Sequence, residues 1–73
     1  MFKIFKKKKL FKECIEIEQR IDDLNRYIDL EEQLIKLATT YSFIRACKKR
    51  IREARLKLLA LELREAEILN ELY

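Results

Sequence analysis

Residues 51–73, IREARLKLLALELREAEILNELY, are apolar around most of their circumference when they are placed on a helical wheel. One set of them follows alternating steps of three and four residues, which is the spacing of a heptad seam. This first seam consists of Ile44, Cys47, Ile51, Ala54, Leu58, Leu61, Ile68 and Leu72, with Glu65 in its one gap. A second set lies roughly opposite and consists of Leu56, Leu59, Leu63, Ala66 and Tyr73. A helix that is apolar nearly all round is typical of a position inside a bundle or an oligomer.

The preceding part of the chain shows the same two-sided pattern. Its first seam has Glu31 in one position and otherwise consists of Leu10, Cys14, Ile17, Ile21, Leu24, Ile28, Ile35 and Ala38. A second seam follows with Tyr27, Leu30, Leu34, Leu37 and Tyr41. Each helix therefore has more apolar surface than one antiparallel neighbour can cover, and this excess predicts a dimer.

The composition supports a small all-α protein. The chain has 73 residues, which is one domain at most, and 41% of them are charged. It contains no Gly and no Pro, on which tight turns between strands depend. Periodic apolar residues among Glu, Lys and Arg are typical of long helices. We expect an antiparallel helical hairpin of two long helices that dimerises into a four-helix bundle.

Residues 38–43, ATTYSF, are the expected turn between the helices, and Thr39, Thr40 and Ser42 are candidate N-caps. The phase of the seam supports a break here, because its extension beyond Ala38 meets Ser42, Arg45 and Lys49 instead of apolar residues. The expected layout is a basic arm over 1–9, a helix over 10–38, a turn over 39–41 and a helix over 42–72. In this register Ile35 faces Cys47 and Leu24 faces Leu58, give or take a turn.

Two other layouts compete with the hairpin. The second seam continues in phase through Ile44, Ile51 and Leu58, which favours one unbroken helix in a long parallel coiled coil. Asp29 and Glu32 have the spacing of a capping box, which would split the first helix in two.

Basic residues gather in two regions of the chain. Lysines crowd the amino end, with Lys6, Lys7, Lys8 and Lys9 in succession. A second group lies on the face turned away from the seam of the second helix and forms a stripe about 15 Å long. This basic stripe consists of Arg45, Lys48, Lys49, Arg52 and Arg55. Such a stripe suits a row of phosphates, with the amino-terminal lysines as an accessory arm. The competing interpretation is a solvated helix face balanced by nearby acids.

The sequence argues against an enzyme. It has no His, the commonest acid–base residue and metal ligand, and no Gly for a phosphate-binding loop. We therefore expect neither a cofactor nor a metal. Cys14 and Cys47 occupy seam positions about 30 Å apart in a hairpin, too far for a disulfide. We expect free, buried thiols in a reducing compartment, hence a cytoplasmic protein. The alternative is a reactive, exposed Cys47 activated by Arg45, Lys48 and Arg50.

We expect a small non-enzymatic oligomer that binds nucleic acid through the basic stripe. The alternatives are a protein–protein interaction module, such as an inhibitor or assembly factor, and a membrane-surface adaptor that uses the Phe/Lys amino terminus. The expected partner is a second copy of the chain. The expected interface consists of Tyr27, Leu34, Tyr41, Leu56, Leu59 and Leu63.

Overall fold

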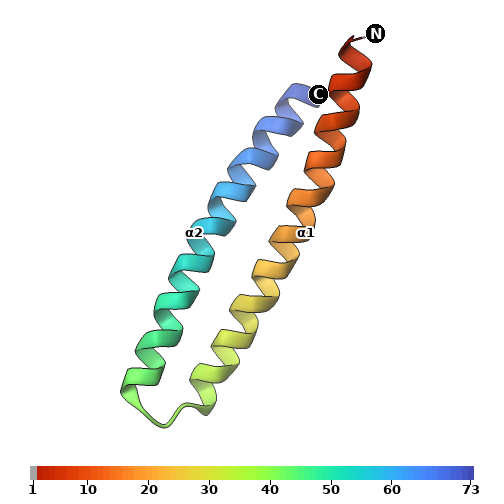
Figure 1. Ribbon diagram of the computed structural model, residues 1–73. Helices are drawn as coiled ribbons and strands as arrows, with labels where there is room; N and C mark the ends of the chain where they lie inside the picture. The colour runs from red at the N-terminus through yellow and green to blue at the C-terminus, as the bar shows by residue number, and fades with distance from the viewer. Residues whose placement is uncertain (1) are drawn as a thin grey trace.

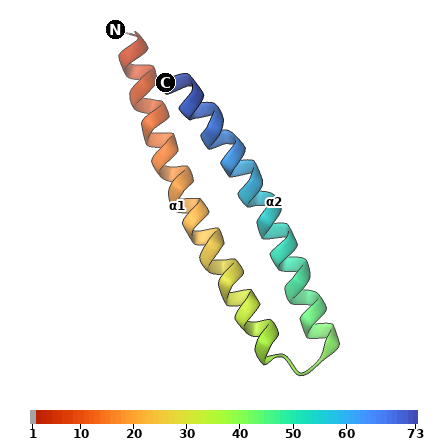
Figure 2. The same cartoon turned by 180° about the vertical axis from the view of Figure 1, so that it is seen from behind.

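The computed structural model describes the backbone of residues 2–73 and the side chains of residues 6–73. Two helices, α1 (Phe2–Leu37) and α2 (Tyr41–Leu72), lie side by side and run antiparallel, as both views show (Figures 1 and 2). They form a rod of 60 × 14 × 14 Å, with the start of α1 and the end of α2 at the same end. The expected helical hairpin is therefore confirmed.

The turn occupies residues 38–40, one residue earlier than expected. The N–H of Ala38 donates to the carbonyl oxygen of Ile35 at 3.2 Å and closes α1, and the carbonyl of Thr40 accepts from the N–H of Ile44 at 3.3 Å. Thr40 is the N-cap of α2 in an extended conformation, and its side chain makes no capping hydrogen bond. This break rules out the unbroken coiled coil.

Helix α1 begins at Phe2, whereas the sequence placed its start at Leu10. The stretch expected as a basic arm is therefore helical. Lysine is a good helix former, and the side chains of Lys6 to Lys9 are all exposed, so water screens their mutual repulsion. The helix also continues through Asp29 without interruption, which excludes the capping-box break.

The core lies along the first seams of both helices, in two clusters. The cluster at the terminal end consists of Leu10, Cys14, Ile17 and Ile68, with Ile21, Leu61 and Leu72 packed against it. The cluster toward the turn consists of Ile28, Ile51 and Ala54, with Leu24, Ile35 and Leu58 packed against it. Leu24 and Leu58 thus share one cluster, and Ile35 packs beside Ile51, one turn beyond Cys47. This is the expected register.

Candidate nucleic-acid interface

The basic stripe lies on the outer face of the first half of α2. Cys47, Ile51 and Ala54 are buried against α1, and the residues of the stripe lie about 70° to 170° around the helix from the centre of this buried face. All five residues of the stripe are accordingly exposed: Arg45, Lys48, Lys49, Arg52 and Arg55. The helix holds these cations in fixed register along its axis.

Most cations of the stripe have no acidic partner among the described side chains. Arg55 reaches across to Glu32 of α1, with Nη2 and Oε1 3.3 Å apart. The guanidinium carbon of Arg45 lies 5.2 Å from the centroid of the Tyr41 ring, which is cation–π distance. Among the residues whose side chains are described, the other members of the stripe form no ion pair with an acid. Most of the positive charge of the stripe is therefore available to an external anion.

Two shallow hollows adjoin the stripe. The first, of about 340 Å³, is lined by Tyr41, Ile44, Arg45, Lys48, Lys49 and Arg52. The second, of about 550 Å³, lies between the helices and is lined by Glu32, Ile35, Lys48, Ile51, Arg52, Arg55, Leu56 and Leu59. In both, cations and apolar side chains share the lining, which suits a ligand that has both charge and flat apolar groups.

The amino-terminal lysines do not join the stripe. Lys6 and Lys7 line a hollow with Glu71, so they lie beside the end of α2. The stripe begins near the turn at the other end of the rod (Figure 1). At 1.5 Å per residue, about 25 to 40 Å separate the two groups. They form two distinct basic surfaces, and one compact ligand cannot contact both on the same molecule.

The basic residue at position 50 has a different role from its neighbours. Arg50 Nε and Nη2 donate to the two carboxylate oxygens of Glu31 at 2.9 and 3.1 Å. The same Nη2 lies 3.3 Å from Cys47 Sγ. The Arg50 hydrogen bonds outweigh burial and lower the pKa of Glu31. Burial and the nearby Glu31 carboxylate raise the pKa of Cys47, which is fully buried. The alternative of an exposed, activated Cys47 is therefore wrong.

A second ion pair joins the helices near the terminal end. Arg64 donates to Glu13 at 2.7 and 3.0 Å and to Glu67 at 3.2 Å. The hydrogen bond from Arg64 lowers the pKa of Glu13. The sequence patterns did not predict this pair, the Arg50–Glu31 pair or the Arg55–Glu32 pair, all of which join the two helices. The Arg50–Glu31 pair could have been anticipated from Glu31, because an acid in a seam position needs a cation on the opposite helix.

The residues expected at the dimer interface are all exposed in the single chain: Tyr27, Leu34, Tyr41, Leu56, Leu59 and Leu63. They do not form one surface. Tyr27 lines a groove with Lys57 and Ala60, whereas Leu56 and Leu59 line the groove on the other side, beside the basic stripe. The hairpin thus has apolar area on both sides, and the leucines of α2 are the part that adjoins the basic stripe.

Within the described residues, neither helix has a segment long and apolar enough to span a bilayer. Comparisons with protein-family models, curated proteins and solved structures found no match to this chain. Its function has to be inferred from the charge and shape of its own surface.

Proposed function

We propose that this chain is a non-enzymatic helical hairpin that binds nucleic acid through backbone phosphates, with the basic stripe as its contact surface. The supporting observation is a set of exposed cations in fixed register on one helix, most of them without an acidic partner in the described chain. Lys and Arg contacts to phosphate dominate binding that does not depend on base sequence. Arginine adds a planar fork of donors that matches phosphate.

The dimensions of the rod favour backbone contact over base reading. The hairpin is 14 Å across, and the major groove of B-DNA is about 12 Å wide. One helix fits such a groove, but two helices side by side do not. The stripe would therefore lie along the phosphates of a duplex or take a single strand. For a single strand, the exposed Tyr41 ring at the end of the stripe offers a surface for base stacking.

We also propose that the chain forms a homodimer through the exposed leucines of α2. Leu56, Leu59 and Leu63 lie beyond the basic stripe toward the carboxyl end. A second copy that approaches antiparallel about Leu59 places the basic half of each α2 beside Glu67 and Glu71 of the other copy. A parallel approach would oppose like charges. The two hairpins then form a four-helix assembly.

The test compares two variants that remove the same charge. One carries Arg45→Gln, Lys49→Gln and Arg52→Gln in the stripe, and the other carries Lys6→Gln, Lys7→Gln and Lys9→Gln in α1. Binding to a short duplex is measured by fluorescence anisotropy over a range of salt concentrations. Each lost phosphate contact should flatten the log–log salt slope by about 0.9, so the stripe variant should flatten it by about 3. The lysine variant should change the slope by less.

The opposite outcome would reject the proposal. If the stripe variant binds as tightly as the parent while the lysine variant or deletion of 1–12 abolishes binding, the stripe is only a solvated face. Binding of anionic vesicles that also depends on the lysines would then favour the membrane-surface function. A second candidate, a docking module for another protein, has the exposed leucines in its favour. It would be supported by a monomeric chain without affinity for nucleic acid.

A further inference from the structure

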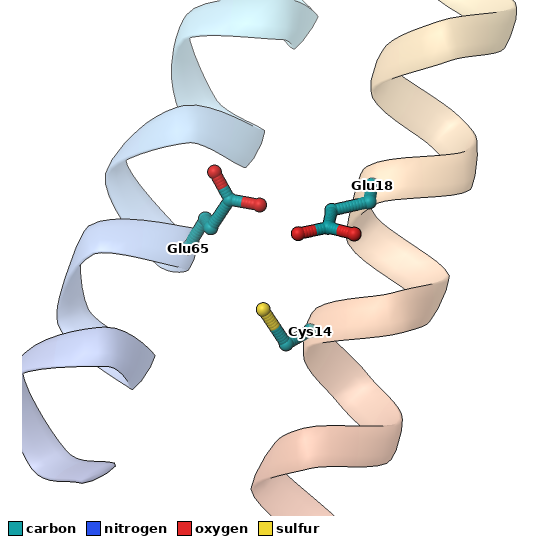
Figure 3. Close-up of side chains that lie close together, drawn as sticks. All are labelled: Cys14, Glu18 and Glu65. Atoms are coloured by element: carbon teal, nitrogen blue, oxygen red, sulfur yellow. The ribbon is translucent and has the colours of Figure 1, made fainter. Parts of the chain in front are cut away.

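Three potential metal ligands from the two helices converge near the terminal end of the rod. Cys14 and Glu18 are one turn apart on α1, and Glu65 faces them from α2 (Figure 3). The Cys14 sulfur and one carboxylate oxygen from each acid all lie within 4.8 Å of one another. Cys14 is only 8% exposed, Glu65 is half-buried, and Glu18 opens to solvent. The cluster is therefore buried at Cys14 and open to solvent at Glu18.

This cluster differs from the other interhelical acids because none of the described side chains gives it a cationic partner. Glu31 and Glu13 are held by Arg50 and Arg64 at 2.9 and 2.7 Å. Among the residues with described side chains, no Lys or Arg forms an ion pair with Glu18 or Glu65. Nor does the buried thiol, which points toward both carboxylates, take part in a described hydrogen bond. Two carboxylates brought this close together, partly out of water, repel unless a cation neutralises them.

The position of Glu65 within the apolar seam further supports a cation site at this cluster. Glu65 occupies a position where the heptad pattern of α2 otherwise places an apolar side chain. The comparable acid in α1 is Glu31, and the chain supplies Arg50 to it from the opposite helix. At Glu65 the opposite helix supplies a thiol and a second carboxylate instead. An arginine in the first case and a cation-binding set in the second are two ways to accommodate an acid within the seam.

We propose that Cys14, Glu18 and Glu65 bind a divalent transition-metal ion of the zinc type, with water completing the coordination. A thiolate favours zinc, cobalt and cadmium over magnesium and calcium. At tetrahedral zinc, bonds of about 2.3 Å to sulfur and 2.0 Å to oxygen place the ligand atoms about 3.3 to 3.5 Å apart. Rotation of the two glutamate side chains, of which Glu18 is exposed, would bring the ligand atoms from within 4.8 Å of one another to this spacing.

The binding step is a simple exchange of a proton for a metal. Burial, with the charges of Glu18 and Glu65, raises the pKa of Cys14, so the free thiol keeps its proton at neutral pH. The incoming cation forms a bond to sulfur and releases that proton to solvent, without any change of oxidation state. Because the ligands come from both helices, the ion also joins the two helices at the terminal end. This inference is independent of the proposed nucleic-acid function.

Cobalt(II) is the probe, titrated into the full chain in oxygen-free buffer. The parent should develop sulfur-to-cobalt charge-transfer absorption and the visible bands of tetrahedral cobalt, and zinc should bleach both. Cys14→Ser should abolish the charge-transfer band, and Glu65→Gln should weaken binding by about tenfold or more. The matched controls are Cys47→Ser, whose neighbouring acid is already held by Arg50, and Glu71→Gln on the same helix. Both should bind cobalt as the parent does.

Circular dichroism on each variant checks that the hairpin is folded, and zinc should raise the melting temperature of the parent but not of Cys14→Ser. The proposal is overturned if the folded parent shows no charge-transfer band. It is also overturned if the band survives Glu18→Gln combined with Glu65→Gln, which would indicate sulfur ligands from separate chains. A band that disappears with Cys47→Ser would place the metal elsewhere.

Discussion

Replacement of Ile68 by alanine should remove a large part of the stability of the hairpin. Ile68 is fully buried in the terminal cluster, against Leu10, Cys14 and Ile17. Burial of an isoleucine side chain contributes about 1.5 to 3 kcal/mol, and the cavity left by truncation raises the cost to about 2 to 5 kcal/mol. The better helix propensity of alanine returns about 0.5 kcal/mol. At about 0.05 to 0.15 kcal/mol per residue, 73 residues give a total stability of about 4 to 11 kcal/mol.

The matched control is Leu63→Ala, since Leu63 is 58% exposed on the same helix. In a monomer this change should cost less than about 0.5 kcal/mol. Both variants are compared by urea unfolding followed by circular dichroism, at several protein concentrations. Equal losses from the two variants at low concentration would refute the assignment of the core to the first seam. A Leu63→Ala loss that grows with protein concentration would instead support the proposed dimer.

Leu59→Glu should dissociate the proposed homodimer, because it places an unpaired charge at the centre of the contact; an unchanged mass by sedimentation equilibrium would contradict that contact. Arg64 and Arg50 hold the folded pKa of Glu13 and Glu31 below the unfolded value. The two ion pairs therefore stabilise the fold when the pH is above the unfolded pKa of the glutamates. This stabilisation is lost as the pH falls through their lower folded pKa. The urea midpoint should therefore decrease in acid, and less steeply in the Glu13→Gln, Glu31→Gln variant. Thr40→Asp should raise the melting temperature, because Thr40 makes no capping hydrogen bond and aspartate is a stronger N-cap, worth up to about 1 kcal/mol. An unchanged melting temperature would mean that the backbone N–H groups at the start of α2 are already satisfied.

The sequence predicted the helices, their antiparallel register and the position of the turn, because all three depend on the phase of the apolar seams. It missed the helical start at Phe2, because the mutual repulsion of Lys6 to Lys9 is weak when these side chains are all exposed to water. The exposure of the basic stripe followed from its position outside the buried seam, about 40° to 160° around the helix from Ile51.

Sequence patterns alone could not identify which side chains of one helix face a given residue of the other. The seam showed that Glu31 and Glu65 each sit among apolar residues, but not which side chains face them. That depends on the rotation of each helix about its own axis, and a rotation of a fraction of a turn exchanges one opposing residue for another. Arg50 opposite Glu31, and Cys14 opposite Glu65, therefore emerged only with the structure.

Two of the interhelical ion pairs enclose loops of very different length, and this difference sets an order of events in folding. Glu31 and Arg50 are 19 residues apart in the chain, whereas Glu13 and Arg64 are 51 apart. Loop-closure entropy makes the longer loop costlier by about 0.9 kcal/mol. The hairpin should therefore close from the turn and zip toward its ends. Disruption of the Glu31 pair should slow folding, and disruption of the Glu13 pair should mainly speed unfolding, which stopped-flow measurements on the two variants would distinguish.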